Sequence, residues 1–137
     1  MMQGSAFGPI QRAMYAMMTA DAQLMTLTSN QVYDDVPQNT NFPYVDFGSM
    51  SSTAYRTHTR GGEEAVATLN VWSIYEGNKE IEAIFQRLNA LFGDKAFAVE
   101  GYDNIMSYYD FSDILLQRDK IRHGVIRYRL LVQEQQN

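Results

Sequence analysis

Histidine and carboxylate side chains are the groups of this sequence that could hold a metal ion or move a proton. The two histidines, His58 and His123, lie far apart along the chain, and neither belongs to an H-x-x-x-H or H-E-x-x-H pattern. Those patterns place two imidazoles on one helix face as zinc ligands. We therefore interpret both histidines as surface or hairpin residues and predict no metal site and no cofactor.

Three acidic pairs stand out among the carboxylates. These pairs are Asp34 with Asp35, Glu63 with Glu64, and Asp110 with Asp113. Neighbouring residues of a strand point to opposite faces, so adjacent carboxylates do not share a proton or a metal unless the backbone turns there. We interpret the pairs as solvated charges of loops and strand ends. Because the nucleophile-elbow, phosphate-loop and dinucleotide-loop motifs are also missing from the sequence, we predict that the protein is not an enzyme.

A basic segment with an aromatic residue stands out in an otherwise acidic chain. Its side chains of interest are Tyr55, Arg56, His58 and Arg60, and Gly61 and Gly62 follow them. Such a segment can contact a phosphate backbone or an acidic neighbouring protein. It can equally be the solvated tip of a hairpin, kept soluble by its arginines. Both interpretations remain open from the sequence.

Length and composition indicate one globular domain over residues 1–137. The chain has 45% hydrophobic and 20% charged residues, a formal net charge of -5, and no cysteine. The absence of cysteine excludes a disulfide framework and a thiolate metal site. The negative charge disfavours a dedicated nucleic-acid binder. The amino-terminal residues resemble neither a signal peptide nor a membrane span, so we expect synthesis and retention in a cytoplasm and no membrane partner.

Hydrophobic periodicity predicts two amphipathic helices. The first covers about residues 9–28, with Ile10, Met14 and Met18 on one face, and Asp21 is expected to cap a further short turn within it. This methionine-rich face fits core filling better than a docking groove. The second helix is expected to follow an amino-terminal cap at Asn78. Its apolar stripe is formed by Ile81, Ile84, Phe85, Leu88, Leu91 and Phe92.

Extended segments account for most of the remaining chain. They are expected at residues 42–48, 64–75, 96–100, 105–117 and 121–134. Neither face of the segment 64–75 is strongly polar, which indicates a central strand. Residues 49–63 are polar and predict a loop or hairpin arm, and residues 134–137 predict a frayed tail. Together the elements indicate an α+β fold: a largely antiparallel sheet, two amphipathic helices packed on one face, and a projecting loop or hairpin arm.

Three stretches resemble a known family. They are residues 41–48 (NFPYVDFG), residues 68–73 (TLNVWS) and residues 126–132 (IRYRLLV). Their sequences, order and spacing are similar to those of the tail-completion, or head-to-tail joining, proteins of long-tailed bacteriophages and gene transfer agents. Residues 49–62 do not align with the family residue by residue. The family offers no catalytic residues to transfer to this chain.

The resemblance implies a tail terminator, a virion structural protein at the head-proximal end of the tail. Such a protein forms a ring, expected to be a homohexamer, that caps the tail tube, ends its polymerisation and joins it to the head. The implied partners are other copies of the chain, the tail tube protein and a head-side connector or stopper. DNA would pass through the lumen without sequence-specific binding, and assembly would occur in the host cytoplasm. The candidate interface or lumen residues are Tyr55, Arg56, His58, Arg60, Asp34, Asp35, Glu63 and Glu64.

Three alternatives remain. The protein could be another neck component, such as a stopper or an adaptor. It could instead be a small ligand-binding domain whose polar groups are Asp110, Asp113 or His123. In the third alternative, the segment 55–60 contacts nucleic acid.

Overall fold

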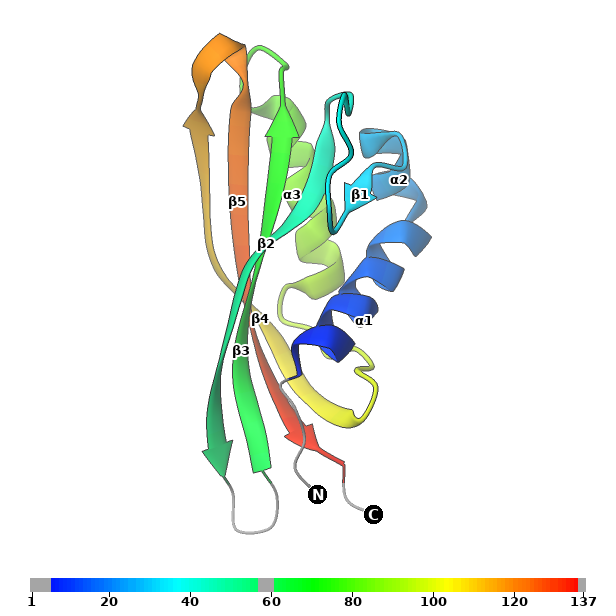
Figure 1. The fold of residues 1–137 in the computed structure, drawn as a ribbon, viewed down its shortest axis with the longest axis vertical. Helices are drawn as coiled ribbons and strands as arrows, with labels where there is room; N and C mark the ends of the chain where they lie inside the picture. Colours follow the sequence, from blue (N-terminus) through cyan, green and yellow to red (C-terminus); the bar gives the residue numbers. More distant parts are fainter. Residues whose placement is uncertain (1–5, 57–60, 136–137) are drawn as a thin grey trace.

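The computed structural model describes residues 6–56 and 61–135. In this part of the chain, three α-helices accompany a five-stranded, mostly antiparallel sheet, which confirms the predicted α+β fold (Figure 1). The elements in chain order are α1 (Phe7–Ala20), α2 (Ala22–Thr28), β1 (Val32–Tyr33), β2 (Tyr44–Arg56), β3 (Gly61–Ser73), α3 (Lys79–Phe92), β4 (Tyr102–Leu116), a short 3-10 helix (Arg118–Lys120) and β5 (Arg122–Glu134).

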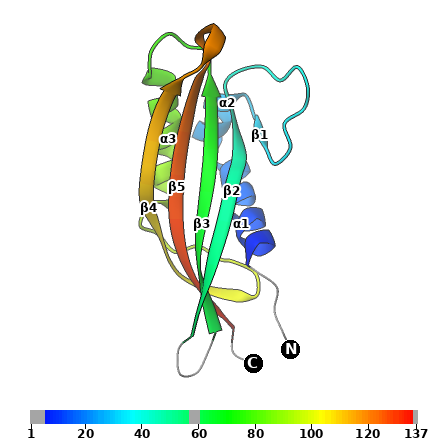
Figure 2. The same cartoon turned by 60° about the vertical axis from the view of Figure 1, so that its left-hand side comes forward.

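The sheet has the strand order β1-β2-β3-β5-β4, and only β1 pairs in parallel with its neighbour. The central position of β3 confirms the prediction of a central strand, which rested on the lack of a strongly polar face. Along β5, Ile126, Tyr128, Leu130 and Val132 are buried, as their alternation predicts. The helices lie on one side of this sheet (Figure 2).

The first helical unit is two helices rather than one. Asp21 has an extended backbone between α1 and α2, and its carboxylate accepts a hydrogen bond from the Leu24 N–H at 2.9 Å. The capping role predicted for Asp21 is thus confirmed. Arg87 of α3 donates two more hydrogen bonds to the same carboxylate, Nε to Oδ2 at 3.1 Å and Nη2 to Oδ1 at 2.8 Å. These contacts hold the pKa of Asp21 below its usual value, chiefly through the Arg87 hydrogen bonds.

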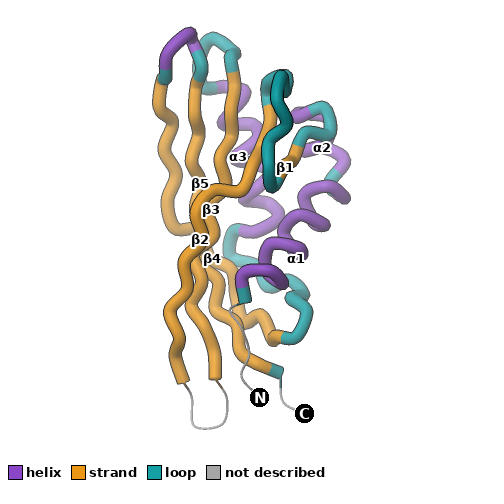
Figure 3. The backbone as a smooth tube through the Cα atoms, in the orientation of Figure 1, coloured by secondary structure: helices purple, strands orange, loops and turns teal. Residues whose placement is uncertain are grey.

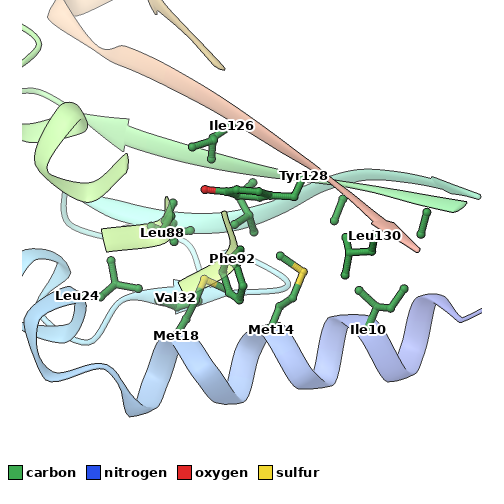
Figure 4. Close-up of a cluster of buried hydrophobic side chains, with 14 of the residues drawn as sticks. Ile10, Met14, Met18, Leu24, Val32, Leu88, Phe92, Ile126, Tyr128 and Leu130 are labelled. Atoms are coloured by element: carbon green, nitrogen blue, oxygen red, sulfur yellow. The ribbon is translucent and has the colours of Figure 1, made fainter. Parts of the chain in front are cut away.

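The core lies between the helices and the sheet. Met14 and Met18 are fully buried, so the methionine face of α1 fills the core as predicted. Phe92 of α3 packs edge-on against Tyr128 of β5 with ring centroids 5.7 Å apart (Figure 4). The Tyr128 hydroxyl donates to Asn89 Oδ1 at 3.0 Å, and burial raises the pKa of Tyr128 strongly.

Three details of the sequence prediction are wrong. Asn78 makes no side-chain cap, because its backbone is helical rather than extended as a capping residue requires, and its Oδ1 accepts from Arg122 Nη1 at 3.0 Å. Residues 96–100 are not a strand, since isolated bridges at Lys95 and Val99 are the only sheet-like contacts of this loop among the described residues. Glu134 is not frayed, because it pairs with β4 as the last residue of β5.

The segment 49–63 is a strand hairpin in its described part rather than a loop. Residues 49–56 belong to β2, residues 61–63 begin β3, and Arg56 pairs with Gly61. The tip, residues 57–60, lies outside the described residues. This end of the sheet lies near the amino end of α1 and the carboxyl end of β5 (Figure 3).

Candidate functional site

The sheet face opposite the helices is an open surface of this fold. Within residues 6–56 and 61–135, no helix covers it (Figure 2). The side chains of alternate residues of β2, β3, β5 and β4 point to this face, and we call it the outer face.

An ionic cluster occupies one part of the outer face. Arg129 Nη1 lies 2.9 Å from Glu64 Oε1, and Arg129 Nε lies 3.1 Å from Asp110 Oδ1. The hydrogen bond to Asp110 is the main cause of a raised Arg129 pKa. The Glu64 and Arg129 side chains are each 45% exposed, so the cluster is accessible to a partner.

An aromatic row crosses the outer face near the ends of β3 and β4. The pairing register places Tyr44, Trp72, His123 and Leu115 side by side on successive strands. The Trp72 and His123 rings stack with centroids 3.9 Å apart, and Tyr44 stacks on Trp72 at 6.3 Å. This row gives the outer face a partly apolar band.

A hydrogen-bond network holds the aromatic row. The Trp72 indole donates to Asp46 Oδ1 at 3.4 Å, and His123 Nε2 donates to Asn70 Oδ1 at 2.8 Å. Burial raises the pKa of Asp46 and lowers the pKa of His123. A Cβ at Gly48 would lie 2.9 Å from Asn70 Nδ2, so glycine leaves room for this amide. The network fixes the orientation of the Trp72 and His123 side chains on the outer face.

Exposed apolar side chains gather on β4. In the described part of the chain, most of the exposed large apolar residues belong to this strand. They are Tyr108, Tyr109, Phe111, Leu115 and Leu116. The Arg127 guanidinium lies 4.8 Å from the centroid of the Phe111 ring and covers part of it. Sequence reasoning missed this surface, although its apolar residues were visible, because only the tertiary structure places β4 at the sheet edge.

The candidate acidic residues do not form one site. Asp34 and Asp35 are exposed in the bend that follows β1. Just before this bend, Val32 of β1 pairs with Val45 of β2, which pairs in turn with Val71 of β3. At a rise of about 3.3 Å per residue, Val71 lies about 25 Å along β3 from Glu63 and Glu64. The two pairs therefore serve different surfaces.

Glu63 and Glu64 point to opposite faces of β3. The Glu63 carboxylate accepts from the Ala6 N–H at 3.1 Å and from Ser52 Oγ at 2.8 Å. It also forms a hydrogen bond with Tyr102. The pKa of Tyr102 is raised, mainly by burial and to a smaller extent by the negative charge of Glu63. Glu63 thus joins the start of α1 to the sheet, whereas Glu64 faces outward in the ionic cluster.

The basic segment is only partly described. The backbones of Tyr55 and Arg56 pair with Gly62 and Gly61 at the end of the hairpin. His58 and Arg60 lie outside the described residues.

The polar residues of the ligand-binding alternative have separate partners. Asp110 binds Arg129, the Asp113 carboxylate accepts from the Ile114 N–H at 2.9 Å, and His123 binds Asn70. Among the described residues, no group of three or more metal-ligating side chains is arranged to hold a metal ion. No helix in this part of the chain is long and apolar enough to span a membrane.

Comparisons with known proteins bear on the family to which the chain belongs. A family model for tail completion protein gp17 matches residues 12–133. The tail completion protein gp17 of Bacillus phage SPP1 is 26% identical over 106 residues, which cover 75% of this chain and 77% of that protein. A chain in the virion of a native gene transfer agent particle has the same fold, with a TM-score of 0.87, 19% identity, and coverage of 96% of this chain and 99% of that chain.

The matched region contains all three sequence stretches that carry the family resemblance, and it includes every strand of the sheet apart from Glu134, the last residue of β5. It also includes β4 with its exposed apolar residues and the outer-face ionic cluster. The predicted resemblance is therefore confirmed: the chain belongs to the tail completion protein gp17 family, a family of structural proteins of phage tails.

Proposed function

We propose that this protein is a tail terminator, a ring that caps the head-proximal end of the tail tube, ends its polymerisation and joins the tail to the head. The family match over residues 12–133 carries the proposal, because it spans nearly the whole chain and the family is named for tail completion. The number of subunits, six, follows the family resemblance.

The surfaces of the subunit support assembly into a ring. A closed ring of identical subunits uses a heterologous interface, in which one surface of each copy binds a different surface of the next. The apolar residues of β4 and the hairpin formed by β2 and β3 are two such unlike surfaces. In this proposal the hairpin projects toward a neighbouring protein. The helices cover one face of the sheet, and the outer face stays open.

The proposed partners lie on the two sides of the ring. One side binds the tail tube protein, and the other binds a head-side connector or stopper. The net charge of -5 suits a conduit that DNA passes without being retained, since like charges repel. The proposed location is the head-proximal end of the virion tail, after assembly in the host cytoplasm.

Particles that lack this protein test the proposal. We expect tails of uncontrolled length that do not attach to heads. In a background that makes no heads, the protein should be found on tails of normal length. Tails of normal length that join heads without the protein would refute the terminator. Recovery of the protein only on heads would identify a stopper or adaptor instead.

A further inference from the structure

We propose that neighbouring copies in the ring pair strand to strand: the segment 109–116 of β4 in one copy binds the segment 47–56 of β2 in the next. We call these the β4 open edge and the β2 open edge. The inference rests on the proposed ring and specifies the contact that builds it.

The β4 open edge begins where a loop stops covering this strand. Ser107 exchanges two backbone hydrogen bonds with Lys95, at 2.7 and 3.0 Å, and Val99 bridges to Tyr102. From residue 109 to residue 116, β4 has β5 as its only strand partner in the described part of the chain. The backbone groups that point away from β5 are available for another strand.

The β2 open edge begins where β1 ends. β1 pairs with Val45 and Asp46, and Gln31 adds a backbone bond to Val45 at 3.0 Å. Among the described residues, β3 is the only strand that pairs with residues 47–56. The two open edges thus belong to opposite sides of one sheet and have similar lengths.

Strand direction permits the pairing. The strands β2, β3, β5 and β4 alternate in direction across the sheet. With four alternating strands, β2 and β4 run in opposite directions. When rotation about the ring axis places the next copy beside this one, β4 therefore lies antiparallel to the β2 of that copy. The contact would continue the hydrogen-bonding pattern that already holds the sheet.

The axial offset of the two open edges fits a closed ring. Measured along β3, the β4 open edge is level with residues 67–73 and the β2 open edge with residues 61–69. Their midpoints differ by about five residues, or about 17 Å at about 3.3 Å per residue. One four-stranded sheet is about 19 Å wide at about 4.8 Å per strand. Pairing the edges therefore inclines the strands by about 40° to the ring axis, within the range of about 35–45° in closed β-barrels.

Side-chain chemistry favours a β2 edge as the partner of β4. Phe111, Leu115 and Leu116 are 39%, 44% and 65% exposed, and an apolar edge strand of this kind is covered in stable proteins. A two-fold contact between two β4 edges would bring the acidic Asp110 and Asp113 of both copies together. The segment 47–56 is rich in serine and contains no acidic residue, so β4 meets no like charge there.

Cysteine cross-linking tests the contact, because the natural chain contains no cysteine. Antiparallel alignment of the two midpoints places Ser112 opposite Ser52, and both residues share strand faces with buried residues. In the full chain carrying S112C and S52C, mild oxidation should give covalent ladders that end in a closed ring. The control carries S112C and Q23C, since Gln23 is exposed on α2 away from both edges. It should stay uncross-linked.

Native mass spectrometry and hydrogen exchange complete the test, on the protein alone and on isolated tail tubes. Residues 47–56 and 109–116 should gain amide protection when rings form. Rings that form without a cross-link from residue 112 to residue 52, or to residue 54 one register step away, would overturn the edge pairing and leave the ring proposal standing. Cross-linked dimers of S112C alone would also overturn it. If no ring forms even on tail tubes, the proposed function fails, and the edge pairing fails with it.

Discussion

Replacing Glu63 with alanine separates its structural role from a role at an interface. The Glu63 carboxylate accepts hydrogen bonds from Ala6 and Ser52 and also binds Tyr102. A hydrogen bond to a charged group contributes about 1.5–3 kcal/mol, and the Ala6 bond also satisfies a donor at the start of α1. We therefore expect Glu63→Ala to lower the free energy of unfolding by about 3 kcal/mol.

The expected change in melting temperature follows from the chain length. Unfolding entropy is about 2.1 cal/mol/K per residue, so each 1 kcal/mol shifts the melting temperature of a 137-residue protein by about 3.5 °C. Glu63→Ala should thus melt about 10 °C below the parent in differential scanning calorimetry at pH 7. Glu64→Ala is the matched control, because its partner Arg129 is solvent-exposed on the opposite face. We expect it to melt within about 2 °C of the parent.

Two results would refute this reasoning. If Glu63→Ala melts within about 2 °C of the parent, its hydrogen bonds contribute little, and Glu63 is better regarded as a solvated interface acid. If Glu63→Ala and Glu64→Ala lower the melting temperature by the same amount, the position of Glu63 on the inner face of β3 does not explain its contribution to stability.

Three further perturbations probe the core, the helix junction and the aromatic row. Tyr128→Phe should lower the urea-derived free energy of unfolding by about 1 kcal/mol, because Asn89 loses its donor, and an unchanged value would contradict that contact. The pKa of Asp21 is lowered in the folded chain, so its stabilisation is present above the ordinary value of 3.8 and disappears as the pH falls through the folded pKa. The urea midpoints of the parent and Asp21→Asn should therefore converge on acidification, and a constant gap would count against the charge pair. Burial lowers the pKa of His123 below its ordinary value of 6.5. As the pH drops from about 7, the unfolded chain therefore binds a proton at His123 before the folded chain does, and the free energy of unfolding should fall. His123→Phe should remove this loss, and the fluorescence of Trp72, the single tryptophan, should titrate below pH 6.5 only in the parent.

The elements that could be predicted are those with a strong local pattern. The spacing of Met14 and Met18 identified the buried face of α1, and the alternation along β5 identified its buried side. The cap at Asp21 was readable because a carboxylate directly before a helix binds its free N–H groups. These features depend on residues within one or two turns of each other.

The incorrect details involve partners that are distant in sequence. Asn78 has the right side chain for a cap, yet its backbone is helical rather than extended, and its side-chain oxygen binds Arg122, which lies 44 residues further along the chain. Residues 96–100 contain strand-forming residues, but this loop contacts β4 only through the isolated bridges of Lys95 with Ser107 and of Val99 with Tyr102. Glu134 reads as part of a polar tail, but pairing with Tyr102 holds it in β5.

The candidate site shows the same division. Residue types alone indicated the absence of enzyme motifs and the resemblance to the tail-completion family, because each depends on composition or on short stretches of sequence. The interpretation of the acidic pairs as solvated charges fits the exposed Asp34 and Asp35 but is wrong for Glu63, whose carboxylate binds Ala6 and Ser52. The placement of Glu63 under α1, the stacking of Trp72 on His123 and the exposure of Leu116 at a sheet edge depended on the strand order. Alternation in a strand specifies which side chains share a face, but not which strand lies beside them. That choice is made by long-range packing of the whole sheet, so only the tertiary structure decided which surfaces this subunit leaves open for its neighbours.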